Sequence, residues 1–172
     1  MTKRRCRGAW SRPARAYVST DATRLVSRTG RDQTSQYPEL SSLATYVNAL
    51  HTVLDGEIVV LGPDGQPSFE SLQQRINISS PTDVERARKT HPVVMYVFDI
   101  LWLDDRDLTH LPLTERREIL HEIVTETGPI AFTYSVEGDG TSFYEAARKL
   151  GIEGIIGKKL DSPYEPGKRS HN

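Results

Sequence analysis

Two acidic residues interrupt a strongly β-forming stretch of the sequence. Residues 53–61 are rich in valine, leucine and isoleucine, but Asp55, Gly56 and Glu57 lie among them. Carboxylates in such a strand are costly to bury unless each has a partner, and a glycine between them allows another backbone to approach closely. The pattern indicates either partnered carboxylates in a site or solvated acids at the edge of a hairpin.

A second stretch, residues 96–103, places one acid among aromatic and aliphatic side chains. Strict alternation along a strand would put Phe98 and Ile100 on the face opposite Asp99. An aromatic ring in the wall of a pocket can stack on a nucleobase. Packing of Phe98 in an ordinary hydrophobic core is the alternative.

A third stretch combines one carboxylate with several cations. Glu153 precedes a predicted strand, Lys158 and Lys159 end it, and Lys168 and Arg169 follow in the next loop. This arrangement suits a divalent cation together with a polyphosphate. A solvated strand end would produce the same run of charges.

The elements that must position these residues alternate without a regular strand–helix–strand order. We predict strands at 16–28 (a hairpin turning at 19–21), 53–61, 93–103, 130–136 and 154–159. We predict helices at 38–50, 69–76, 114–122 and 141–150, with Thr114 as an N-cap, Leu120 and Ile123 facing inward, and a polar loop at 79–82. Hairpin-joined strands favour an α+β fold with mainly antiparallel sheets over a doubly wound parallel sheet.

Length and composition indicate one compact unit of 172 residues. The 22 basic and 23 acidic residues argue against a generally basic nucleic-acid-coating protein. Cys6 is the single cysteine, which fits a reducing compartment. Residues 93–98, the longest apolar run, are too few to span a bilayer, and no leader sequence opens the chain. We therefore expect a soluble cytoplasmic protein with no membrane partner.

The near-neutral total conceals a separation of charge. Residues 1–31 carry nine basic side chains and one acid, for a net charge of +8, so the remaining residues sum to −9. We expect residues 1–15 to form a basic, disordered arm, because residues 1–14 show no helical or strand periodicity. Such an arm can attract phosphate backbones through salt-sensitive contacts.

In order and spacing, these stretches resemble the covalent nucleotidyltransferases, specifically the adenylation domain of bacterial ATP-dependent DNA ligases of the ligase D type. Residues 54–57 are similar to motif III of that family, 96–103 to motif IIIa and 153–159 to motif IV. Further matching pieces are residues 24–32 after the nucleophile motif, 68–75 after motif III, and 161–164 and 166–170 after motif IV.

The resemblance implies a fold, a reaction and a set of site residues. The fold would be the nucleotidyltransferase (ATP-grasp-like) ligase adenylation fold. In the family, a lysine takes AMP from ATP, passes it to a 5′-phosphate at a DNA nick, and the nick is then sealed. Partners would be nicked double-stranded DNA and other end-joining proteins, with Mg²⁺ or Mn²⁺ as cofactor, in DNA repair and recombination. The implied residues are Arg28, Glu57, Phe98, Lys158 and Lys159 for ATP, Glu153 and Glu57 for the metal, and Arg31, Lys168 and Arg169 for DNA.

The sequence departs from the family where the nucleophile should lie. The motif Lys-x-Asp-Gly-x-Arg is expected just before Tyr17, but residues 8–16 contain no lysine and no Asp-Gly. The lysine pair of motif V and the oligonucleotide-binding-fold domain would come after Asn172. We therefore expect residues 16–172 to be a partial adenylation domain, incomplete at both ends and unable to self-adenylate.

Two other functions stay open on the sequence alone. RNA ligases and mRNA-capping guanylyltransferases share the motif order, although residues 161–164 and 166–170 weigh against them. A non-catalytic nucleotide- or DNA-binding module, using the basic arm, is the other alternative.

Overall fold

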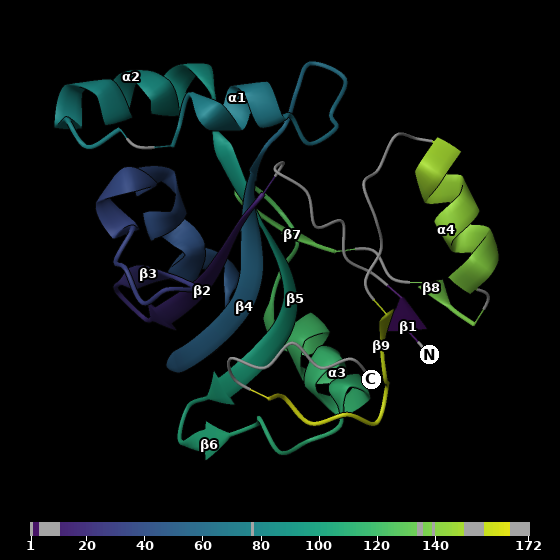
Figure 1. The fold of residues 1–172 in the computed structure, drawn as a ribbon. Helices are drawn as coiled ribbons and strands as arrows, with labels where there is room; N and C mark the ends of the chain where they lie inside the picture. The colour runs from purple at the N-terminus through teal and green to yellow at the C-terminus, as the bar shows by residue number, and fades with distance from the viewer. Residues whose placement is uncertain are drawn as a thin grey trace.

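Six strands form the main sheet of the chain, in the order β3-β2-β4-β5-β6 with β7 also beside β5 (Figure 1). Their bounds are Arg12–Ser19 (β2), Thr23–Ser27 (β3), His51–Val60 (β4), Val93–Leu103 (β5), Arg106–Asp107 (β6) and Ile130–Phe132 (β7). All pairs are antiparallel except β5 and β7. The predicted α+β fold with mainly antiparallel sheets is therefore confirmed.

The structure is a computed structural model that describes residues 2–3, 11–76, 78–133, 136–138, 140–149 and 157–165. The predicted hairpin is present as β2 and β3, but β2 begins at Arg12, four residues earlier than expected. Alternate residues of β2, Ala14, Ala16 and Val18, are buried. These small inward side chains extend the strand, so Arg12 and Arg15 belong to the sheet.

The helices are α1 (Phe69–Gln73), α2 (Pro81–Thr90), α3 (Leu113–Ile123) and α4 (Gly140–Lys149), with the 3₁₀ helices η1 (Thr34–Gln36) and η2 (Pro38–Tyr46). The sequence predicted a longer α-helix in place of η2. Leu40 and Leu43 are its buried residues, three positions apart, and that spacing suits the three-residue turn of a 3₁₀ helix.

Helix α2 was missed from the sequence, where residues 79–82 were expected to be loop. The helix begins with Pro81 in its first turn, a position that proline favours. Its buried residues are Val84 and Ala87, which make too narrow an apolar stripe to be recognised by periodicity.

The predicted cap of α3 is wrong, although its inner face is confirmed. The helix begins at Leu113, after Pro112, with no side-chain cap. The backbone N–H of Thr114 donates instead to the carbonyl oxygen of Leu160, at 3.1 Å. Leu120 and Ile123 are buried as expected.

A second, three-stranded sheet has the order β8-β1-β9 and joins distant parts of the sequence. Its strands are Val136–Glu137 (β8), Thr2–Lys3 (β1) and Gly157–Lys158 (β9), and β1 is antiparallel to both neighbours. In Figure 1 this sheet and α4 lie on the opposite side of β5 from the β2–β3 hairpin.

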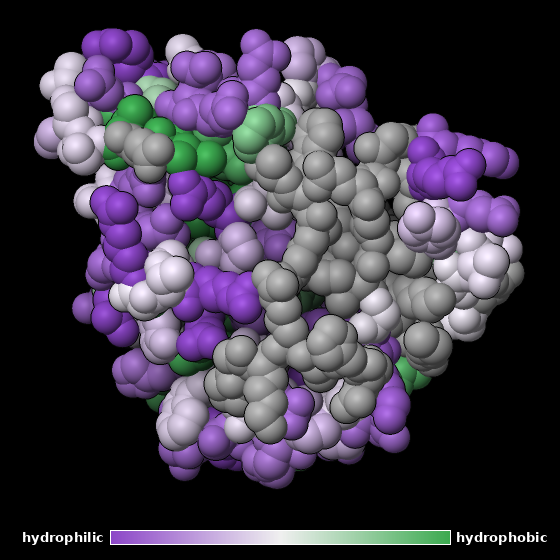
Figure 2. Space-filling model, in the orientation of Figure 1, coloured by the Kyte–Doolittle hydropathy of each residue, from purple (hydrophilic) through white to green (hydrophobic). Residues whose placement is uncertain are grey.

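The hydrophobic core joins the inner face of the main sheet to η2 and α3. Ala16, Leu54 and Val97 from the strands lie in one cluster with Leu43 of η2 and Leu120 of α3. On the face shown in Figure 2, hydrophilic side chains cover most of the described surface, and apolar residues gather near α1 and α2. None of the described helices is long and apolar enough to cross a membrane.

Candidate nucleotide site

Phe98 lies at an irregularity between the two central strands. The register pairs Asp55 with Asp99 and Gly56 with Val97, so Phe98 is an extra residue on β5. A bulge of this kind redirects a side chain and is common beside active sites. Phe98 is half-buried, whereas Asp99 next to it is fully buried.

A second register shift, between Val53 and Leu54, follows on the same pair of strands. Asp99, Ile100 and Leu101 are all buried in succession. The predicted alternation, which would put Ile100 on the face of Phe98, is therefore wrong. Irregular pairing, which residue types alone do not reveal, is the reason.

At Gly56 the backbone of β5 lies close against β4. A Cβ atom at this position would lie 2.6 Å from the carbonyl oxygen of Tyr96 and 2.9 Å from Cε of Met95. Real side chains essentially never make such contacts, so no larger residue fits without moving β5. The close backbone approach predicted from the glycine is confirmed.

The two acids beside Gly56 are both partnered. Glu57 is 7% exposed, and the hydroxyl of Ser11 donates to its Oε2 at 2.9 Å. The phenol of Tyr164 donates to Oδ2 of Asp55 at 3.1 Å. Because β4 lies between β2 and β5, the alternative of solvated acids at a hairpin edge is wrong.

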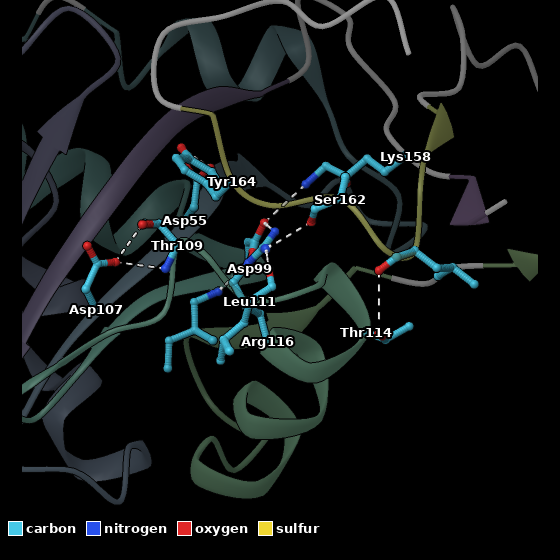
Figure 3. A network of polar contacts seen from close by, with 12 residues as sticks. Asp55, Asp99, Asp107, Thr109, Leu111, Thr114, Arg116, Lys158, Ser162 and Tyr164 are labelled. Atoms are coloured by element: carbon cyan, nitrogen blue, oxygen red, sulfur yellow. Dashed lines mark hydrogen bonds and ion pairs between the residues drawn. The ribbon is translucent and has the colours of Figure 1, made fainter.

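A buried ion pair joins Asp99, the residue after Phe98, to Arg116 (Figure 3). Arg116 of α3 donates from Nε to Oδ1 of Asp99 at 2.7 Å and from Nη2 to Oδ2 at 3.0 Å. Asp99 is 0% exposed and Arg116 is 2% exposed. A bidentate pair with this burial satisfies both charges and fixes the two side chains relative to each other.

Lys158 adds a second cation to the same carboxylate. Its Nζ lies 3.5 Å from Oδ2 of Asp99 and 4.8 Å from the centroid of the Phe98 ring. The ammonium is thus placed for both an ionic and a cation–π contact. The Lys158 side chain is 30% exposed, so this ammonium lies beside an aromatic ring within reach of the protein surface.

Tyr164 closes the other end of this network (Figure 3). Burial raises the pKa of the Tyr164 phenol from its ordinary value of 10.0 to about 12, the negative charge of Asp55 acts in the same direction, and Arg15 opposes them. The phenol therefore stays protonated, and able to donate to Asp55, throughout the neutral range.

The two predicted arginines lie at the same end of the sheet as Glu57. The register aligns Ser27 of β3 with Ala14 of β2, and Ala14 with Gly56 of β4. The turn after β3 therefore lies level with Gly56 but two strands away, which is roughly 10 Å at the usual strand spacing. Arg28 and Arg31 in that turn are exposed. Strands β2 and β4 lie between β3, which leads into this turn, and Phe98 on β5.

Lys159, the neighbour of Lys158 in the sequence, is not brought into this cluster. Lys159 is exposed, on the other side of the chain from Lys158. Glu153, Lys168 and Arg169 lie outside the described residues. No group of three or more potential metal ligands gathers within the described part of the chain, where Glu57 is the one predicted metal ligand.

Sequence reasoning missed Arg116, although a signal for it exists. The buried residues of α3 are Leu113, Arg116, Leu120 and Ile123, at the spacing of one helical face. A charged residue in an otherwise apolar stripe requires a buried partner of opposite charge. Asp99, the one acid in the most apolar strand, was the residue that this argument would have selected as the partner of Arg116.

The class of protein is defined by comparison of this chain with known proteins. Residues 11–172 match the family model described as the ATP dependent DNA ligase domain, and the chain belongs to this family. It is 42% identical over 146 residues to the multifunctional non-homologous end joining protein LigD of Mycolicibacterium smegmatis, covering 85% of this chain and 18% of that protein.

Solved structures agree with the family. The ligase domain of LigD from M. tuberculosis superposes with a TM-score of 0.74 at 33% identity, over 98% of this chain and 50% of that one. A mycobacterial DNA ligase D complexed with ATP and MES gives a TM-score of 0.72 at 34% identity, over 92% of this chain and 48% of that one. The chain thus spans about half the length of these ligase structures.

Proposed function

We propose that this chain binds ATP and nicked double-stranded DNA as part of an ATP-dependent DNA ligase of DNA end joining. The observation that carries the proposal is the position of Phe98 at the bulge between β4 and β5, with the Lys158 ammonium 4.8 Å from its ring centroid and Glu57 one residue beyond Gly56 on β4. These residues supply an aromatic surface, a carboxylate and a cation, which are the groups that a nucleoside triphosphate requires. Family membership supports the same function.

Each of these residues has a separate part in nucleotide binding. The ring of Phe98 stacks on adenine, and Lys158 provides a fixed charge for the phosphates. Glu57 accepts a hydrogen bond from the ribose or contributes to a metal site with Glu153. Mg²⁺ or Mn²⁺ neutralises phosphate charge when bound, and one or two carboxylates with phosphate oxygens and waters suit Mg²⁺.

The covalent step requires a group that residues 8–16 do not contain. In the family reaction a lysine nitrogen attacks the α-phosphate of ATP, the bond from the α- to the β-phosphate breaks, pyrophosphate leaves, and AMP stays on the lysine as a phosphoramidate. No neighbouring acid, base or cation replaces that nitrogen. We therefore infer that the chain binds ATP without becoming adenylated. Arg28 and Arg31, with Lys168 and Arg169, would contact the phosphates of the nick.

Intact-mass measurement after incubation with Mg²⁺ and ATP, together with a calorimetric ATP titration, tests this proposal. We expect no added AMP, saturable binding of ATP, and weaker binding of GTP, which a capping guanylyltransferase would prefer. Stacking on one aromatic side chain is worth about 1–3 kcal/mol. The Phe98→Leu variant should therefore lose about five- to 150-fold in affinity.

The matched control is Tyr144→Leu, which removes an exposed aromatic ring from α4. Its ATP affinity should equal that of the parent chain. Absence of ATP binding would contradict the proposal as a whole. An AMP adduct would contradict only the inferred inability to self-adenylate, and mapping the modified lysine would locate the nucleophile.

A further inference from the structure

We propose that residues 158–165, here called the strap, form a latch that Tyr164 closes and that holds Lys158 in place for the phosphates of ATP. The inference rests on the proposed ATP-binding function and deepens it. Tyr164 is then a positioning residue, acting on the nucleotide through Lys158 and not by touching it.

The strap alternates in exposure along its whole length. Lys158, Leu160, Ser162 and Tyr164 are half-buried, and the residues between them are exposed. Every second residue therefore faces the body of the protein. A segment in which each inward residue is bonded is held as a unit, although it carries little regular secondary structure.

Each inward residue makes a contact with the body of the protein. Lys158 reaches Asp99 at 3.5 Å, and the carbonyl oxygen of Leu160 accepts the N–H of Thr114 at 3.1 Å. The carbonyl oxygen of Ser162 accepts from Nη1 of Arg116 at 3.2 Å. Two of these contacts thus involve the buried Asp99–Arg116 pair.

Tyr164 anchors the far end twice. Its N–H donates to the carbonyl oxygen of Thr109 at 2.8 Å, and its phenol donates to Asp55 at 3.1 Å. The loop that receives it is itself fixed, because Asp107 accepts from the N–H of Thr109 at 2.8 Å and from its hydroxyl at 2.6 Å. The strap thereby connects β9 to β4 across β5.

Arg116 joins the two ends of the strap. Its guanidinium lies 5.9 Å from the Tyr164 ring centroid, donates to Ser162, and pairs with the same carboxylate as Lys158. Release of Tyr164 therefore loosens the segment whose other end carries the ammonium. An unlatched Lys158 must be ordered when ATP binds, and ordering of one long side chain with its segment weakens binding by about three- to tenfold.

The test is titration of the full chain with ATP in the presence of Mg²⁺. We expect Tyr164→Phe, which removes only the phenol oxygen, to weaken ATP binding by about three- to tenfold. Asp55→Ala removes the acceptor of the same bond and should act in the same direction. The matched control is Tyr144→Phe on the exposed face of α4, which should leave the affinity unchanged.

A double-mutant cycle separates positioning from a general loss of structure. In a Lys158→Gln background, Tyr164→Phe should have no further effect on ATP affinity, because the group it positions is absent. Hydrogen exchange of peptides covering the strap should be faster in Tyr164→Phe than in the parent chain and unchanged in Tyr144→Phe.

Three outcomes would overturn the inference. The first is an ATP affinity of Tyr164→Phe equal to that of the parent chain. The second is an effect of Tyr164→Phe that is undiminished in the Lys158→Gln background. The third is hydrogen exchange of the strap that is the same in Tyr164→Phe as in the parent chain. If the parent chain itself does not bind ATP, the proposed function fails and the inference falls with it. That result is distinct from the other three, because it is seen before any substitution is made.

Discussion

At the scale of single residues, Asp99 and Arg116 place opposite charges in a position that water does not reach. Such a pair is stable only while both partners are present, since either one alone would be an uncompensated buried charge. The pair fixes the relative positions of β5, α3 and the strap, because all three meet at it. The stability of the pair and the position of Lys158 therefore depend on each other.

We predict that Arg116→Leu lowers the free energy of unfolding by about 3–5 kcal/mol, because it leaves Asp99 buried without its main partner. Chemical denaturation at neutral pH measures this. The double variant Asp99→Leu/Arg116→Leu should be more stable than Arg116→Leu, since it buries no charge. The reverse order would show that the pair is not the source of the loss.

The control for this prediction is Arg86→Leu on α2. Arg86 is 71% exposed and its partner Asp83 is 47% exposed, at a distance of 3.2 Å. Ion pairs at such exposure contribute little, so the free energy of unfolding should change by about 0.5 kcal/mol or less.

The titration of Tyr164 gives a second prediction at this scale. Its pKa is about 12 in the folded chain and 10.0 in an unfolded one. A group whose pKa is higher in the folded state stabilises the fold fully at pH values below its unfolded-state pKa. That contribution is lost as the pH rises through its folded-state pKa. The parent chain should thus lose more stability than Tyr164→Phe between about pH 9 and about pH 12.

Denaturation of both proteins across this interval, with tyrosinate absorbance followed in parallel, provides the measurement. The pKa of Tyr37 is also raised, chiefly by burial, but Tyr37 is common to both proteins and cancels in the comparison. Identical pH profiles of stability would contradict the prediction.

At the scale of the elements, the bulge in β5 depends on the absence of a side chain at Gly56. We predict that Gly56→Ala destabilises the chain by about 1–3 kcal/mol, because its Cβ would press on the backbone of Tyr96. The same displacement would move Phe98, so ATP affinity should fall as well. Denaturation and the ATP titration measure the two effects separately.

Gly62→Ala is the control for this change. Its Cβ would lie 3.0 Å from Oδ1 of Asp64, the tip of a flexible side chain that can turn aside. The effect on stability should be well below that of Gly56→Ala, and ATP affinity should not change. Equal losses in both variants would show that the backbone contact at Tyr96 is not decisive.

The elements also show how far the sequence allows prediction. Strand β5 was predicted at its observed bounds, because ten of its eleven residues are apolar or aromatic and no turn residue interrupts them. The close approach at Gly56 was also foreseen. The sequence did not predict the position of Phe98 at a bulge or the contact of Tyr164 with Asp55, 109 residues away. Both depend on pairing between distant segments.

At the scale of the whole molecule, the separation of charge sets a prediction for DNA binding. Residues 1–31 carry +8 and the rest of the chain −9. If the basic segment contacts phosphates, affinity for a nicked duplex falls steeply with salt. Replacing Arg4, Arg5 and Arg7 with alanine should lower the slope of log K against log salt by up to about 2.7, at about 0.9 for each lost contact.

Binding of the nicked duplex at several salt concentrations measures this slope, for instance by fluorescence anisotropy. A control that removes charge elsewhere is Arg86, Arg88 and Lys89 to alanine on α2. An unchanged slope in the first variant would show that the basic segment does not contact DNA, and a lower slope in the second would place the DNA over α2.

The pairing of β1 with β8 and β9 has a consequence for how the chain folds during synthesis. Thr2 pairs with Glu137 and with Lys158, so the small sheet joins the start of the chain to segments made more than a hundred residues later. The main sheet can assemble once β7 has left the ribosome, whereas the first residues must wait for β9. Contacts so distant in sequence form slowly, and completion of the small sheet is therefore expected to be the last step of folding.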